Sequence, residues 1–145
     1  MNIKFKKHVV ITAGLTLLFL WKAQQGIFYY DEWEQTFRKQ RIFSGWEPFL
    51  AQANLVCLLI TGVWLLLGVL RKRVNVYGIG LATALLALYT VYSQLVWTGA
   101  FGLNSCTCIG WFKNMSWPAI FTMNLLLLFV AILCLLVRLK ERRSS

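Results

Sequence analysis

The sequence predicts an all-helical membrane protein, a bundle of four transmembrane helices with a short interfacial helix between the first two spans. The chain of 145 residues is 59% hydrophobic and has a mean hydropathy of +0.63, whereas soluble domains are about half apolar. Four apolar runs can each cross a hydrocarbon core of roughly 30 Å, which takes about 20 helical residues. The runs do not alternate between apolar and polar residues, which favours helices over spanning strands. The expected spans are residues 9–30, 49–70, 76–100 and 117–137, within one domain that covers 1–145.

The first span, 9–30, follows a basic start, but no small-residue cleavage site comes after it, so we expect an uncleaved span. The outer connection 31–48 holds Trp33 and Phe37 at the i, i+4 spacing of one helix face, which predicts a short helix lying in the membrane interface. Aromatic side chains are enriched at that depth. The expected interface anchors are Trp33, Phe37, Trp46, Trp111 and Trp117.

The later elements follow from turn and breaker residues. The connection 71–75 is short, so the second and third spans should be antiparallel neighbours. The outer loop 101–116 contains the Gly, Asn and Ser residues of an irregular loop. Ser116 and Pro118 mark the start of the last span, because proline is tolerated in the first helical turn.

The net charge of +10 is distributed as in a membrane protein rather than as in a nucleic-acid-binding protein. Basic clusters lie beside span ends on alternate connections, which is the positive-inside pattern. The termini and the connection 71–75 should therefore face the cytoplasm, and the loops 31–48 and 101–116 should face outward, in a bacterial inner membrane. The basic surface should face anionic lipid headgroups. The clusters are Lys4, Lys6 and Lys7, then Arg71, Lys72 and Arg73, and finally Arg138, Lys140, Arg142 and Arg143.

Cys106 and Cys108 are the residues that we expect to carry chemistry, since they place two thiols one residue apart in the last outer loop. Alternate residues of an extended chain lie near the upper limit of the ~4.4–6.8 Å Cα separation that a disulfide accepts. A disulfide between them should be strained and easily reduced, which favours a redox-active pair. A structural disulfide, a metal site and inert thiols remain alternatives. A metal site has little support because the single histidine, His8, lies on the other side of the membrane.

Polar residues within the spans form a second candidate group. Lys22 and Gln25 share one face of the first span, and ionisable groups at membrane depth tend to face a bundle interior or to extend toward the headgroups. Most of these residues should form hydrogen bonds between helices, and the alternative is a polar pocket beside the thiols. Two further thiols, Cys57 and Cys134, fall within spans and are expected to pack there. The candidate polar group is Lys22, Gln25, Tyr89, Ser93 and Asn124, with Asn54 near the outer end of the second span.

The chain resembles the MauE/DoxX-like group of redox-associated four-span membrane proteins. The similarity lies in Cys106-Thr107-Cys108-Ile109-Gly110 before the last span, and in Trp117 through Asn124 leading into a leucine-rich helix. Lys22 near the end of the first span is also similar. Family members commonly have Cys-Gly-Cys-Phe-Gly, so this chain departs from the pattern at Thr107 and Ile109. The resemblance implies an accessory role in the maturation of periplasmic disulfide-containing proteins, beside a thioredoxin-like partner.

The leading functional prediction is a membrane thiol–disulfide accessory protein that acts through Cys106 and Cys108 on a periplasmic thioredoxin-like protein or a disulfide-containing client. Two alternatives stay open. One is a non-enzymatic subunit of a larger membrane complex. The other is a quinone-linked disulfide oxidoreductase in which Tyr89, Tyr92 and Trp97 line a quinone pocket. The leading prediction requires no cofactor, and whether the protein is an enzyme stays open between these alternatives.

Overall fold

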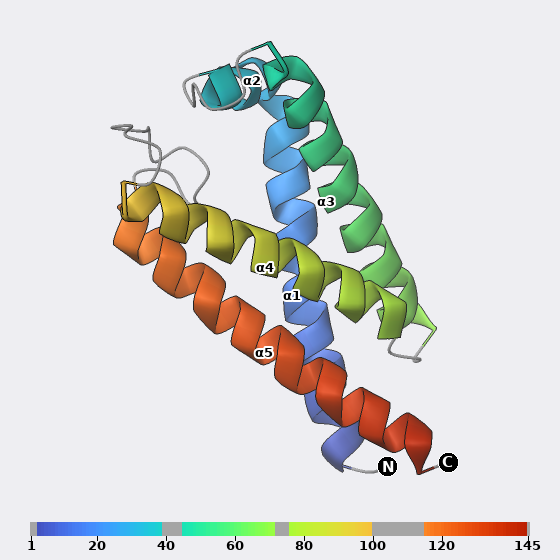
Figure 1. Ribbon diagram of the computed structural model, residues 1–145. Coiled ribbons are helices and arrows are strands. Elements are labelled where there is room, and N and C mark those ends of the chain that lie inside the picture. The colour runs from blue at the N-terminus through green and yellow to red at the C-terminus, as the bar shows by residue number, and fades with distance from the viewer. Residues whose placement is uncertain (1–2, 39–44, 72–75, 100–114, 145) are drawn as a thin grey trace.

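The computed structural model describes residues 3–38, 45–71, 76–99 and 115–144, and all of the regular structure in these ranges is helical (Figure 1). This confirms the all-helical prediction for the described part of the chain. Each predicted span and the short helix of the first outer connection have a counterpart. The helices are α1 (Ile3–Phe28), α2 (Tyr30–Arg38), α3 (Glu47–Leu70), α4 (Val76–Trp97) and α5 (Trp117–Arg143).

Three of the helices, α3, α4 and α5, are long and apolar enough to cross a membrane. The prediction of four spans is therefore corrected to three for the part of the chain that the structure describes. Helix α1 has 26 residues and is long enough, but polar residues occur at both of its ends. Lysines precede its apolar run, and Lys22, Gln24 and Gln25 interrupt that run before the helix finishes.

Helix α2 follows α1 almost directly, with only Tyr29 between them. The Tyr29 N–H donates to the Gln25 carbonyl at 3.0 Å, and the Trp33 N–H donates to the Tyr29 carbonyl at 2.9 Å. Backbone hydrogen bonds continue across the junction, so no loop separates the two helices. Helix α2 continues the helical segment of α1 after a sharp bend. Asp31 lies in its first turn, where a negative charge favours the helix N-terminus.

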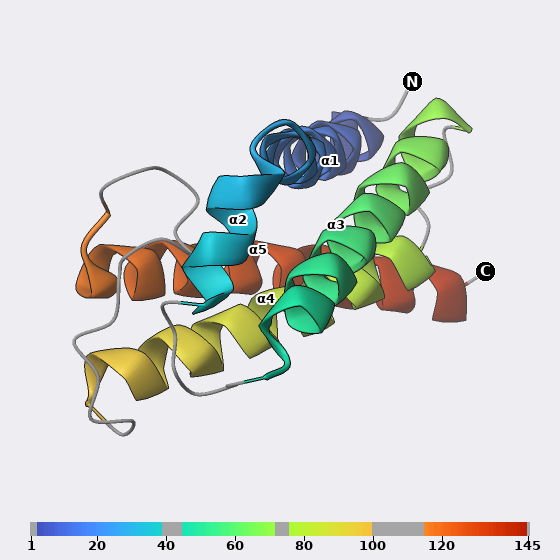
Figure 2. The same ribbon diagram turned by 90° about the horizontal axis from the view of Figure 1, so that it is seen from above.

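The long helices form two antiparallel pairs. Helix α1 packs mainly on α3, and α4 packs mainly on α5, while the pairs meet through a smaller contact between α3 and α4 (Figures 1 and 2). Within the first pair, Gly62 allows a close approach, because a Cβ there would lie 2.7 Å from Leu20 Cδ2. One core nevertheless joins the four long helices, and it comprises Leu15, Phe19, Ala23, Leu58, Leu65, Ile79, Ala82, Leu86, Ala131 and Cys134.

The two ends of the molecule differ. The start of α1 and the end of α5 lie at one end, whereas α2 lies toward the other end, together with the end of α4 and the start of α5 (Figure 1).

The outer surfaces of α3 and α5 are apolar, as surfaces that face lipid should be, since hydrocarbon chains solvate leucine as well as a protein core does. Hydroxyl and amide groups, in contrast, lie inside, where Thr12, Thr61 and Asn124 are almost completely buried. Exposed apolar side chains include Val56, Ile60, Val63 and Leu67 on α3, and Leu126, Phe129, Leu133 and Leu136 on α5.

Candidate functional site

The predicted thiol pair, Cys106 and Cys108, lies outside the described residues, as does Trp111. Their pairing and surroundings stay predictions. The structure does describe the two residues that bracket this segment, Gly99 and Met115. The end of α4 and the start of α5, next to these residues in the sequence, lie toward the end of the molecule that carries α2 (Figure 1).

The ends of α4 and α5 that flank the thiol segment are joined by aromatic contacts. Trp97 lies against Phe121 with ring centroids 5.7 Å apart, and Tyr92 meets the edge of Trp117 at 6.4 Å. Such tilted and edge-on pairs contribute about 0.5–1.5 kcal/mol beyond the area that they bury. The two helix ends that precede and follow the cysteines are thus held side by side.

The start of α5 is as the sequence predicts. Ser116 is the N-cap residue, with extended backbone angles (φ −69°, ψ 156°), and Pro118 lies in the first turn. At the other end of the segment, Gly99 has a positive φ of 73°, and its N–H donates to the Val96 carbonyl at 3.1 Å. A left-handed conformation suits glycine and ends α4 at Trp97, three residues before the predicted limit.

Tyr89, Asn54 and Asn124 form a polar contact between three helices. The Tyr89 hydroxyl on α4 donates to Asn54 Oδ1 on α3. Asn124 on α5 is almost completely buried, and its Nδ2 makes a long contact of 3.5 Å with the Tyr89 carbonyl. The structure therefore brings together three of the predicted polar residues, Tyr89, Asn124 and Asn54, and Asn54 links the contact to α3.

Ser93, another predicted residue, is buried, but its hydrogen bond stays within its own helix. Its Oγ donates to the Thr90 carbonyl at 2.9 Å, and Thr90 Oγ1 donates to the Leu86 carbonyl at 2.7 Å. Thr61 on α3 does the same with the Cys57 carbonyl, at 2.7 Å. Local bonds of this kind satisfy hydroxyl groups in apolar surroundings without a partner helix.

Lys22 lies beneath helix α2. Its Nζ is 5.5 Å from the centroid of the Trp33 ring, and the Trp33 Nε1–H donates to the Ala51 carbonyl of α3 at 3.2 Å. A Cβ on Gly26 would lie 3.4 Å from the same ring, so Trp33 packs closely on α1. Gln25, the residue before Gly26, is half-buried, and its carbonyl accepts the N–H of Tyr29. Trp33 thus connects α1, α2 and α3.

The sequence predicts Trp33 only as an anchor in the membrane interface, and its contact with Lys22 was not foreseen. The i, i+4 pairing of Trp33 with Phe37 is confirmed, with ring centroids 6.0 Å apart. The other expected anchors differ in exposure, because Trp46 is 65% exposed whereas Trp117 is half-buried. Their position at a membrane surface stays a prediction.

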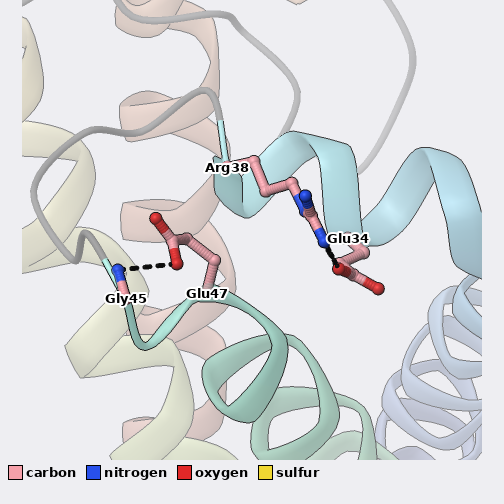
Figure 3. A network of polar contacts seen from close by, with 4 residues as sticks. All are labelled: Glu34, Arg38, Gly45 and Glu47. Atoms are coloured by element: carbon pink, nitrogen blue, oxygen red, sulfur yellow. Dashed lines mark hydrogen bonds and ion pairs between the residues drawn. The ribbon is translucent and has the colours of Figure 1, made fainter.

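A charged contact stabilises the end of α2 (Figure 3). Arg38 Nη2 donates to Glu34 Oε1 at 2.6 Å, and the Gly45 N–H donates to Glu47 Oε2 at 2.8 Å. The hydrogen bond and the charge of Glu34, with a smaller effect of the Glu47 charge, raise the pKa of Arg38 above its ordinary value. Because the Arg38 side chain is 65% exposed, this ion pair is a surface contact and does not form a buried site.

The two described cysteines have different surroundings, and neither forms a disulfide. Cys134 is buried in the core and hydrogen-bonds the Thr12 side chain of α1, which confirms its predicted packing role. Cys57 lies on the exposed surface of α3, so the prediction that it packs inside was wrong. The positions that face outward could not be read from its span, because that span is apolar on all sides.

These features define a small, all-helical, multi-pass membrane protein whose helices are joined by a few polar contacts. A model of the family described as "Methylamine utilisation protein MauE" matches residues 6–137. The chain therefore belongs to the MauE family, in agreement with the resemblance seen in its sequence. Comparisons with curated proteins and with solved structures gave no match.

Proposed function

We propose that this protein supports the thiol–disulfide maturation of exported proteins, and that Cys106 and Cys108 carry out the exchange. The observation that carries the proposal is the position of the two helix ends that flank the thiols in the sequence. Cys106 and Cys108 fall within the family match. The end of α4 and the start of α5 lie toward the end of the molecule opposite the termini (Figure 1).

The distribution of charge supports an outward orientation for that end. The end of α3 and the end of α5 lie at the end of the molecule that carries the termini (Figure 1). They carry the exposed residues Arg71, Lys140, Arg142 and Arg143. Four of the five acidic residues, Asp31, Glu32, Glu34 and Glu47, lie in or beside α2. By the positive-inside rule, the termini are cytoplasmic and α2 lies on the outer side of a bacterial inner membrane.

Helix α1 crosses the membrane in this proposal, beside α3. Its support is the core that it shares with the three candidate spans through Leu15, Phe19 and Ala23. Lys22 lies near the outer end of α1, where Trp33 covers it. Charged side chains close to a helix end reach the interface at a modest cost, so Lys22 does not prevent insertion.

The proposed chemistry is thiol–disulfide exchange. The thiolate of one cysteine attacks a sulfur of a client disulfide, forms a mixed disulfide, and releases the other client sulfur as a thiolate. The second cysteine of the pair then attacks the mixed disulfide. The client leaves as a dithiol, and Cys106 and Cys108 become a disulfide, which an exported thioredoxin-fold protein reduces again. In the reverse direction the same steps oxidise a client.

The description of the family supports a particular class of client. It refers to methylamine utilisation, so we propose that the client is an exported, disulfide-containing protein used in that process. The required groups are two thiols and a protein partner, and the proposal includes no cofactor. The quinone-linked alternative gains no support, because the Tyr89 hydroxyl is already bonded to Asn54.

Single and double cysteine variants test this function. In Cys106→Ser or Cys108→Ser, the remaining thiol forms a mixed disulfide that nothing resolves, so one of the two variants should accumulate a client adduct that a reductant removes. The double variant should form no adduct and should lower the yield of the mature client. Cys57→Ser is the matched control, since it removes an exposed thiol of α3 and should leave both results unchanged.

The opposite result would favour a non-enzymatic subunit of a larger complex. In that case the double cysteine variant would support normal client maturation, and the protein would co-purify with a large membrane partner regardless of its thiols.

A further inference from the structure

We infer that the end of the molecule opposite α2 carries a binding surface for anionic phospholipid headgroups. The surface is formed by Arg71 at the end of α3 and by Lys140, Arg142 and Arg143 at the end of α5, and we call it the basic collar. All four residues are exposed. The inference does not depend on the proposed thiol chemistry.

The length of α5 places three of these cations at headgroup depth. Trp117 begins the helix and Arg143 ends it. At ~1.5 Å per residue, Lys140 lies ~34 Å and Arg143 ~39 Å from Trp117 along the helix. A hydrocarbon core is roughly 30 Å thick, so the last turn of α5 extends into the headgroup layer when Trp117 lies at the opposite boundary.

Helix α3 gives the same result independently. Arg71 follows its last residue, Leu70, and its N–H donates to the Leu67 carbonyl at 3.0 Å. Arg71 lies ~36 Å along the helix from Glu47, again just beyond a hydrocarbon core of roughly 30 Å. The ends of α3 and α5 lie at the same end of the molecule (Figure 1). Cations at the ends of two separate helices, α3 and α5, therefore lie at the depth of the same headgroup layer.

The collar has little negative charge nearby. Glu141 is the one acidic residue at this end, and its Oε2 lies 2.8 Å from Arg138 Nη1, so it is paired on its own helix. The remaining acids belong to the α2 end. An anionic phosphate close to the collar consequently meets mainly cations, and each Lys or Arg near an anionic surface strengthens the attraction roughly five-fold.

A second role of these residues must be separated from lipid binding. Lys140, Arg142 and Arg143 occupy the last turn of α5, where cations also stabilise the helix C-terminus. Stabilisation of the helix C-terminus depends on charge alone and does not depend on which lipid is present. Selectivity between anionic and zwitterionic lipids is therefore the property that identifies a headgroup surface.

The test uses the full-length protein in nanodiscs that contain equal amounts of phosphatidylglycerol and phosphatidylcholine with the same acyl chains. Lipids retained on the protein after extraction are measured by native mass spectrometry. We expect phosphatidylglycerol to be retained roughly five-fold or more over phosphatidylcholine, the factor for one effective cation. In the variant R71Q/K140Q/R142Q/R143Q this preference should fall several-fold, while the other cations of the same end keep a smaller remainder.

Three controls keep the result interpretable. The variant R71K/R142K/R143K keeps the charges and should keep the preference, and circular dichroism should show the same helix content in all variants. For the unaltered protein, raising the ionic strength toward about 1 M shortens the Debye length to about 3 Å and should reduce the preference. Equal retention of the two lipids by the unaltered protein, or an unchanged preference in the neutralised variant, would overturn the inference.

Discussion

The ammonium group of Lys22 lies over the indole ring of Trp33, 5.5 Å from the ring centroid, while the same indole donates its N–H to the Ala51 carbonyl. One side chain of α2 thus contacts α1 through its ring and α3 through its nitrogen. Cation–π contacts contribute about 0.5–2 kcal/mol, depending on how far the cation is removed from water. This arrangement holds α2 against the bundle and covers the one lysine within the apolar part of α1.

Replacing Trp33 with phenylalanine separates the two contacts. Trp33→Phe keeps an aromatic ring beside Lys22 but removes the donor to Ala51, so it should lower the free energy of unfolding by about 0.5–1.5 kcal/mol. It should also increase proteolysis of α2. Trp46→Phe is the control, because Trp46 is 65% exposed, and it should change neither property. Denaturant unfolding in detergent micelles measures both variants. Equal stability of Trp33→Phe and Trp46→Phe would contradict this role of the indole N–H.

The packing of α1 on α3 depends on the absence of a side chain at Gly62. In Gly62→Ala the new Cβ would lie 2.7 Å from Leu20 Cδ2 and 3.0 Å from Leu20 Cγ. Overpacking of this kind costs about 1–3 kcal/mol. Gly80→Ala on α4 is the matched control, since nothing lies within 4 Å of its Cβ position, and it should be neutral or stabilise by up to about 1 kcal/mol. Unfolding midpoints that shift equally in both variants would show that the helices are not closely packed at Gly62.

The hydrogen bond between Tyr89 and Asn54 should couple α3 to α4. A double-mutant cycle with Tyr89→Phe and Asn54→Ala measures this coupling directly. Hydrogen bonds between membrane helices average about 0.6 kcal/mol and reach about 1.7 kcal/mol, so the coupling energy should fall in that range. Asn54→Ala combined with Thr83→Val provides a control, because Thr83 bonds to its own helix at the Ile79 carbonyl. Additive effects of Tyr89→Phe and Asn54→Ala would exclude the interaction.

The sequence predicts where helices occur better than where they end. The last span was expected to finish at residue 137, but α5 continues to Arg143. Hydropathy detects the part of a helix that lies in hydrocarbon, whereas the helix continues wherever its backbone bonds continue. For the same reason α1 begins at Ile3, before its apolar run. The predicted first span also includes the polar residues from Lys22 onward, so α1 is not among the helices that are apolar enough to cross a membrane by composition alone.

The polar contacts were predicted as a group but not as pairs. The sequence identifies Tyr89 and Asn124 as polar residues within apolar spans, yet Tyr89 and Asn54 are 35 positions apart and meet only through the fold. Ser93 has equal polarity and instead bonds to Thr90 of its own helix. Small hydroxyl groups can be satisfied locally, while the long tyrosine side chain reaches a neighbour, and the sequence alone does not choose between these outcomes.

The central claim is that Cys106 and Cys108 lie on the outer side of the membrane, where an exported protein reaches them. Labelling with a membrane-impermeant maleimide tests it most directly, in a Cys57→Ser/Cys134→Ser background that leaves only this pair. After mild reduction, intact cells should be labelled as fully as permeabilised cells. Labelling that appears only after the inner membrane is permeabilised would place the pair in the cytoplasm and would contradict the proposed function.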